Sequence, residues 1–213
     1  MSTVGSAQLG REIRAISLIG FGHFLSHFYM FGLVPLTVPI VSDLDISAVE
    51  LALIYGAFNV ATAILQTPMG VLVDRLGARR VLIGGLFVTS ASFLLCGLTS
   101  SYWELLALYT LAGAGNSVFH PADFVILTAS VDESRQGKAY SIHSFGGAVG
   151  IGAPLIIMTL LWNLTNWRMA IVIAGAVGII LCLIFMFYSG TLSEDAETKR
   201  KPKVPIRNVL NRG

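Results

Sequence analysis

Long apolar runs alternate with short polar segments along this chain. Six of the runs have about 20 residues or more, which is the length that a helix needs to cross the roughly 30 Å hydrocarbon core of a bilayer. They lie at residues 14–41, 49–73, 80–99, 103–130, 139–161 and 168–189. We therefore expect an all-α polytopic membrane protein with six transmembrane helices at 14–189. A polar N-terminal segment at 1–13 and a basic tail at 190–213 flank this domain.

The composition supports this class of protein. Hydrophobic residues make up 54% of the 213 residues, charged residues only 12%, and the mean hydropathy is +0.75. A soluble domain carries about 25% charged residues, so this chain has too little charge to cover a water-facing surface. Cys96 and Cys182 lie inside apolar runs and are interpreted as packing residues. No serine elbow, metal-ligand pattern or phosphate loop occurs, so we expect no enzyme, no metal and no cofactor.

The basic residues fall almost entirely at one end of the predicted helices. Of the fourteen Lys and Arg residues, only Arg168 lies in a segment at the opposite end. Cytoplasmic loops of membrane proteins carry the excess of Lys and Arg, so both termini are predicted to be cytoplasmic in a multi-pass protein of the inner cell membrane. This charge placement also explains the basic tail, and no nucleic-acid partner is expected.

The polar segment between the second and third runs carries a recognisable pattern. It reads GVLVDRLGARRVL and resembles the loop between helices 2 and 3 of the major facilitator superfamily of secondary transporters. The resemblance implies a protein of two six-helix halves, of which this chain is the N-terminal one. It also implies a cytoplasmic gate, to which the matching positions belong: Gly70, Asp74, Arg75, Gly77 and Arg79.

Asp74 has more than one interpretation within this loop. The resemblance implies that its carboxylate helps to latch the two halves together, with a helix of the second half as its partner. The residues alone also allow a local pair with Arg75 or Arg79, or a partner in another subunit. A solvated turn explains the arginines but not their combination with Gly70 and Gly77, which suit a close backbone approach and a positive φ.

All four histidines and one aspartate fall inside apolar runs: His23, His27, His120, Asp123 and His143. Ionisable residues at membrane depth are costly and by default mark a substrate or ion pathway. A buried carboxylate beside a histidine suits proton transfer near neutral pH, so we assign these residues to substrate or proton handling. The alternative for each histidine is a hydrogen bond that holds two helices together. A histidine metal site lacks a carboxylate or cysteine to complete its ligand set.

The second run carries a weaker polar stripe. Tyr55, Asn59, Thr62 and Gln66 recur at spacings of four, three and four residues, which places them on one helix face. Asn59 and Gln66 are candidates for the substrate or proton pathway. The alternative is that these polar side chains only hold neighbouring helices together.

Small residues and prolines predict local packing and bends. Gly146 and Gly150 form a G-x-x-x-G pattern that allows close helix contact, and Pro154 ends this glycine-rich stretch. Pro35 and Pro39 remove backbone hydrogen bonds, so they are predicted to bend the first helix near its outer end.

Three further segments point to one branch of the superfamily. GHFLSHFY from Gly22, FHPAD from Phe119 and SIHSFGG from Ser141 resemble elements of helices 1, 4 and 5 in the fosmidomycin-resistance-like transporters. The resemblance implies proton-linked movement of a small organic compound, often export. It also implies that helices 1 and 4 line the central path and that helices 3 and 6 are peripheral.

These observations predict secondary active transport of a small organic solute by alternating access, coupled to protons. The expected partners are the solute, protons, the lipid bilayer, and either a second six-helix half or a second copy of this chain. The tail at 190–213 resembles the linker between two halves. The alternative is a truncated half that transports nothing and serves as an accessory or scaffold subunit of the membrane.

Overall fold

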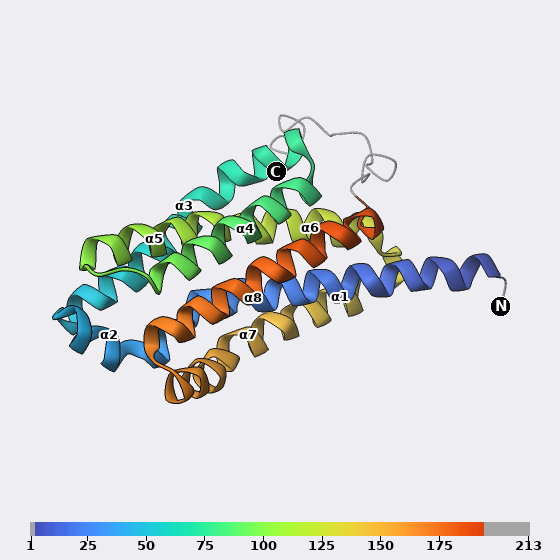
Figure 1. Cartoon of the computed structure of the whole chain (residues 1–213). Helices are drawn as coiled ribbons and strands as arrows, with labels where there is room; N and C mark the ends of the chain where they lie inside the picture. The colour runs from blue at the N-terminus through green and yellow to red at the C-terminus, as the bar shows by residue number, and fades with distance from the viewer. Residues whose placement is uncertain (1–2, 194–213) are drawn as a thin grey trace, which may run out of the picture.

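The computed structural model describes residues 3–193, which fold into a bundle of long, nearly aligned helices (Figure 1). No strand occurs among these residues. The tail at 190–213, which is predicted to resemble the linker between two halves, lies outside the described residues from 194 onward. The helices are α1 (Thr3–Phe31), η1 (Val34–Leu36), α2 (Thr37–Leu44), α3 (Ala48–Leu76), α4 (Ala78–Cys96), α5 (Tyr102–Asn116), α6 (Phe119–Ser130), η2 (Glu133–Arg135), α7 (Gln136–Leu164), α8 (Trp167–Tyr188) and η3 (Ser189–Thr191).

Five of the six predicted spans appear in the described residues as helical segments long and apolar enough to cross a membrane. These are Gln8–Leu44, Ala48–Leu76, Ala78–Cys96, Glu133–Leu164 and Trp167–Tyr188. The sixth predicted span, 103–130, is covered by two shorter helices in succession, α5 and α6. The expected continuous helix is therefore wrong at this place, whereas the all-helical membrane fold is confirmed.

Polar side chains cap the N-termini of three helices. Ser47 accepts a hydrogen bond from the Glu50 amide, and the Glu50 carboxylate accepts one from the Ser47 amide in return, so α3 starts with a complete capping box. Ser101 and Asn166 accept amide hydrogen bonds in the same way at the starts of α5 and α8. The junction of α3 and α4 is a single residue, Gly77, with φ of 90°, which costs a glycine little.

The first span is interrupted as the prolines predict. Proline lacks an amide hydrogen, so Pro35 cannot donate to the carbonyl of Phe31, and α1 ends at Phe31. Other groups bond the carbonyls near this interruption. The Tyr109 hydroxyl lies 2.9 Å from the Tyr29 carbonyl oxygen, and the Tyr55 hydroxyl donates to the carbonyl of Leu33 at 3.1 Å. These hydroxyl groups add to the backbone amide hydrogen bonds that the same two carbonyls accept from Gly32 and Leu36.

The fourth span is interrupted by the same chemistry at Pro121. This proline removes the amide that would bond the carbonyl of residue 117, and the helix breaks at 117–118. Hydroxyl groups bond the carbonyls that precede the break: Thr89 donates to Ala112, Thr62 to Gly113 and Ser117 to Ala114. The helices before and after the break pack on different neighbours. The helix α5 packs mainly on α3 and α4, whereas α6 packs on α1 and α4.

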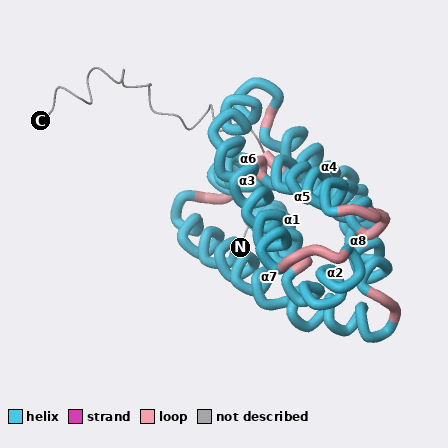
Figure 2. Tube along the Cα trace, turned by 90° about the vertical axis from the view of Figure 1, so that its left-hand side faces the viewer, coloured by secondary structure: helices cyan, strands magenta, loops and turns pink. Residues whose placement is uncertain are grey.

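The helix α1 lies near the middle of the bundle (Figure 2) and packs most extensively on α7. Glycines allow this contact, because a Cβ atom on Gly146 would collide with the backbone of Gly20, and one on Gly150 would collide with the carbonyl oxygen of Phe24. Pro154 lies inside α7 and does not end it. The close helix contact expected at the G-x-x-x-G pattern is therefore made with α1.

Polar contacts gather at both ends of the bundle. At one end, Arg135 makes two hydrogen bonds of 2.7 and 2.8 Å to the carboxylate of Glu12, which is buried. Also there, Ser193 bonds to Ser130, so the start of α1 and the segment after α8 lie at the same end. At the other end, Arg168 pairs with Asp43 at 2.7 Å. The shared end agrees with an even number of crossings.

The helices differ in how much of their surface the bundle covers. Half of the most apolar stretch of α4 is buried, compared with 22% of the corresponding stretches of α3 and of α7. Among the five membrane-length segments, those of α3 and α7 therefore have the largest exposed apolar surfaces.

The contact between α1 and α7 predicts that an alanine substitution lowers the thermal stability at one glycine of α7 and does not lower it at another. Gly150→Ala places a methyl group against the backbone of α1, and overpacking of this kind costs about 1–3 kcal/mol. Gly152→Ala is the matched control, since its Cβ would meet nothing within 4 Å. Thermal unfolding of the purified chain in detergent should show a lower midpoint for Gly150→Ala and an unchanged or higher one for Gly152→Ala. Equal midpoints would contradict the packing described here.

Candidate functional site

Five ionisable residues from three helices meet inside the bundle and form what we call the histidine cluster. His23 and His27 come from α1, His120 and Asp123 from α6, and His143 from α7. The ring of His23 stacks on that of His143 with centroids 3.8 Å apart, and its centroid lies 4.6 Å from that of His27 and 5.2 Å from that of His120. The five residues that the sequence assigned to substrate or proton handling are therefore neighbours.

Hydrogen bonds to His23 define which nitrogens carry protons in the neutral state. The carbonyl oxygen of His143 lies 2.8 Å from Nδ1 of His23, and a carbonyl only accepts, so Nδ1 carries the hydrogen. The Nε2 atom of a neutral His23 is then an acceptor, and Nε2 of His27, 3.0 Å away, donates to it. This assignment, inferred from the hydrogen bonds, leaves Nδ1 of His27 with a lone pair.

Asp123 and His143 form the innermost pair of the cluster. Nε2 of His143 lies 3.0 Å from Oδ2 of Asp123, and the two side chains are 4% and 0% exposed, respectively. A carboxylate without solvent is costly unless it is paired or protonated. The pair therefore shares at least one proton, which sits on either the imidazole or the carboxyl oxygen.

Several buried polar atoms of this region have no hydrogen-bond partner among the described residues. They are Nδ1 of His27, Nδ1 of His120, Oδ1 of Asp123 and Oδ1 of Asn116. Asn116 ends α5 directly before the break in the fourth span. Asn116 was not predicted from the sequence, although an amide side chain five residues before Pro121 inside an apolar run is a signal that could have identified it.

Room for the cluster comes from Gly147, the last residue of the SIHSFGG segment, whose role was not predicted from the sequence. A Cβ atom on Gly147 would lie 2.5 Å from Cε1 of His23 and 3.0 Å from Cδ2 of His27. Only glycine at this position lets both imidazoles occupy the space beside α7. Gly146 serves the helix contact and Gly147 serves the site, whereas Gly150 serves the helix contact and also lies against the Cβ atom of His27.

Three of the histidines are close enough to share a metal ion. One ring nitrogen of each of His23, His27 and His120 lies within 4.8 Å of the others. The sequence predicts no metal because no carboxylate or cysteine completes the ligand set. The fold supplies a third imidazole from another helix, which spacing along the chain does not reveal.

The polar stripe of α3 separates into two parts. Tyr55 and Thr62 bond carbonyls of the first and fourth spans, as described above. Asn59 is exposed and donates to the carbonyl of Tyr55 in its own helix at 2.8 Å, and Gln66 is half-buried. The ring and hydrogen-bond contacts that define the histidine cluster involve neither Asn59 nor Gln66, so their place in the pathway stays a prediction.

The loop pattern of the predicted gate lies at the end of the bundle that holds most basic residues. Asp74 and Arg75 are exposed in the last turn of α3. Arg79 donates to the carbonyl of Ser189 after α8 at 3.0 Å. A Cβ on Gly70 would find its nearest described neighbour, in Pro121, at 3.9 Å, so no described helix crowds this glycine.

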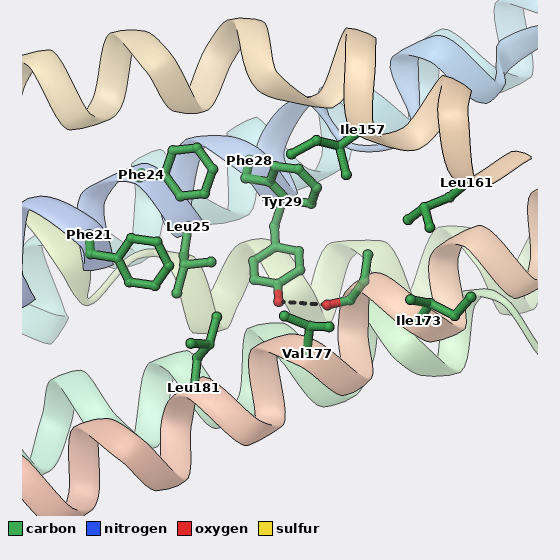
Figure 3. Close-up of a pocket in the computed structure, with 11 residues that line it drawn as sticks. Phe21, Phe24, Leu25, Phe28, Tyr29, Ile157, Leu161, Ile173, Val177 and Leu181 are labelled. Carbon is green, nitrogen blue, oxygen red and sulfur yellow. Dashed lines mark hydrogen bonds between the residues drawn. The ribbon is translucent and has the colours of Figure 1, made fainter.

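An apolar cavity of about 290 Å³ lies between α1, α7 and α8 (Figure 3). Phe21, Leu25 and Phe28 line it from α1, on the helix face opposite to His23 and His27 by the 3.6-residue period. The Tyr29 hydroxyl, which also faces it, already donates to the carbonyl of Ala174 at 3.1 Å. The residues that line this cavity are apolar apart from Tyr29, whose hydroxyl is already bonded, whereas ionisable groups from three helices gather in the histidine cluster.

Comparison with known proteins shows which family this chain belongs to. A family model described as Major Facilitator Superfamily matches residues 19–212. The chain is 30% identical over 158 residues to a probable 4-methylmuconolactone transporter of Cupriavidus pinatubonensis, a match that covers 72% of this chain and 37% of that protein. It is 26% identical over 200 residues to the fosmidomycin resistance protein of Escherichia coli, covering 92% and 48%.

A solved structure shows the same fold. A bacterial homologue of the human lysosomal transporter Spinster, in an inward-facing and unoccupied conformation, matches with a TM-score of 0.79 and 20% identity. The match covers 92% of this chain and 47% of that protein. The chain thus spans less than half of the length of each of these relatives. The resemblance that the loop pattern carries is confirmed, and the chain belongs to the Major Facilitator Superfamily, a family of membrane transporters rather than enzymes.

Proposed function

We propose that this chain is the N-terminal half of a secondary transporter that moves a small organic solute by alternating access and couples this movement to protons. Transport of small organic solutes is the activity named for relatives such as the probable 4-methylmuconolactone transporter. The finer parts of the proposal rest on the histidine cluster. Ionisable groups at membrane depth are costly, and a cluster of five is best explained by a function in an ion or substrate pathway.

The observation that carries proton coupling is the buried pair of Asp123 and His143. The two side chains share a proton at an N···O separation of 3.0 Å, and His143 stacks directly on His23. From His23 a hydrogen bond continues to His27. Protons gained or lost by the pair change the charge that faces the rest of the cluster, so they change how well a charged solute binds there.

The outer members of the cluster suit contact with a solute. His27 and His120 are half-buried, whereas His23, Asp123 and His143 are buried. In repeat-built transporters the site lies near the bilayer midplane between two halves that rock about it, and it is often formed by discontinuous helices. The breaks in the first and fourth spans fit this description, as does the position of His120 in the first turn of α6.

The second half, or a second copy of the chain, is proposed to cover the faces of α3 and α7 that the bundle leaves exposed. Gly70, Asp74, Arg75, Gly77 and Arg79 would then form the cytoplasmic gate, with both termini on the cytoplasmic side by the positive-inside rule. The rival function, a half that transports nothing, predicts no uptake by any assembly that includes this chain.

Replacement of Asp123 tests the proton coupling. In proteoliposomes of the complete transporter that carries this half, Asp123→Asn should abolish solute uptake driven by a pH gradient, because the pair loses its titratable carboxyl group. Exchange of labelled for unlabelled solute, which needs no net proton movement, should persist. Suitable first probes are 4-methylmuconolactone and fosmidomycin.

Asp43→Asn is the matched control, since Asp43 pairs with Arg168 at one end of the bundle, away from the cluster. This variant should keep uptake that responds to the pH gradient. Unchanged gradient-driven uptake by Asp123→Asn at several pH values would refute the role of Asp123 as proton carrier.

Gly147→Ala tests whether the shape of the cluster matters for transport. The added methyl group would displace His23 from the carbonyl of His143, so we expect uptake to fall at least about tenfold, equivalent to about 1.4 kcal/mol. Gly152→Ala in the same helix should retain wild-type uptake, since its Cβ meets nothing. Wild-type uptake by Gly147→Ala would show that the positions of the imidazoles do not limit transport. Thermal unfolding of both variants separates lost function from lost folding.

A further inference from the structure

We propose that His23, His27 and His120 form a binding site for a divalent transition-metal ion of the zinc class, with one coordination position left open for water or solute. The site goes beyond the proposed transport of an organic solute and does not depend on it. Imidazole nitrogen is a preferred ligand of Zn²⁺, Co²⁺, Ni²⁺ and Cu²⁺, and three protein ligands with one open position are the usual arrangement of reactive zinc sites.

The distances suit a metal ion after small side-chain rotations. Zn–N bonds of about 2.0–2.1 Å in a tetrahedron place ligand nitrogens about 3.3 Å apart. The Nε2 atoms of His23 and His27 are already 3.0 Å apart. All three ligand nitrogens lie within 4.8 Å of one another, so the widest pair needs to close by at most about 1.5 Å.

The surroundings of His23 are those of a prepared ligand. Metal-binding histidines usually donate their second ring N–H to a carbonyl or carboxylate, which fixes the tautomer and the ring orientation. His23 makes this contact with the carbonyl of His143 at 2.8 Å, so its Nε2 lone pair points into the cluster. His23 and His27 are four residues apart on α1, which is the helical spacing of paired zinc ligands.

The cluster also holds nitrogen atoms that the protein leaves without a partner. Nδ1 of His27 and Nδ1 of His120 are buried and make no hydrogen bond within the described residues. A buried polar atom without a partner costs about 1–3 kcal/mol, so a metal ion bonded to Nδ1 of His120 would supply the partner that the fold leaves out. His27 would bind through Nε2, which lies 3.0 Å from Nε2 of His23, and its ring proton would then reside on Nδ1. A metal ion here would join α1 to α6, the helix that follows the break in the fourth span.

Binding is tested directly on the 213-residue chain in detergent, purified through a tag that contains no histidine. Addition of Co²⁺ should produce the visible absorption of a four- or five-coordinate site at one ion per chain, and Zn²⁺ should displace it. His27→Gln and His120→Gln, both at half-buried positions, should each weaken Zn²⁺ binding at least about tenfold. Thermal unfolding checks that each variant is folded.

Asp43→Asn is the matched control, since Asp43 pairs with Arg168 at one end of the bundle, away from the cluster. It should keep Zn²⁺ binding at the wild-type level. Zn²⁺ binding is measured on the chain without transport, so failure of the metal site is distinguishable from failure of proton coupling. The proposal is overturned if the wild-type chain shows no stoichiometric Co²⁺ absorption, or if folded His27→Gln and His120→Gln bind Zn²⁺ as tightly as wild type.

Discussion

The structure depends on one constraint, which is that every backbone carbonyl freed inside a membrane needs a donor from the protein itself. Pro35 and Pro121 each remove such a donor, and hydroxyl groups bond carbonyls beside both breaks. The break before Pro121 changes the neighbours of the fourth span from α3 to α1. It therefore delivers His120 and Asp123 to the two histidines of α1 and to His143 of α7.

The resulting cluster gathers five ionisable groups in the interior of the bundle. Asp123 and His143 are buried and share a proton, whereas His27 and His120 are half-buried and retain unsatisfied nitrogens. The proposed proton pair is Asp123 with His143, and the proposed metal ligands are His23, His27 and His120, so the two proposals use neighbouring imidazoles of one cluster. A metal ion binds only deprotonated ring nitrogens, so a proton on any of the three ligand histidines would compete with it.

Much of the fold could be predicted from the sequence because the signals are local. Apolar run length identified the membrane segments, and Pro35 and Pro39 predicted a bend near the outer end of the first helix, where α1 ends at Phe31. The same rule applies to Pro121, but the run 103–130 was apolar enough to hide the break. Gly147 and Asn116 were missed because their roles depend on contacts between helices. The meeting of three histidines from two helices depends on the fold, and no spacing along the chain encodes it.

Infrared spectroscopy of the chain between about pH 5 and pH 8, the range in which histidine charge changes, tests the central claim most directly. The claim is that Asp123 and the histidines form one proton-exchanging unit. We predict a protonated-carboxyl C=O band that changes over this range, disappears in Asp123→Asn and persists in Asp43→Asn. A carboxyl spectrum that does not respond to pH, or that responds equally in Asp123→Asn, would contradict the claim.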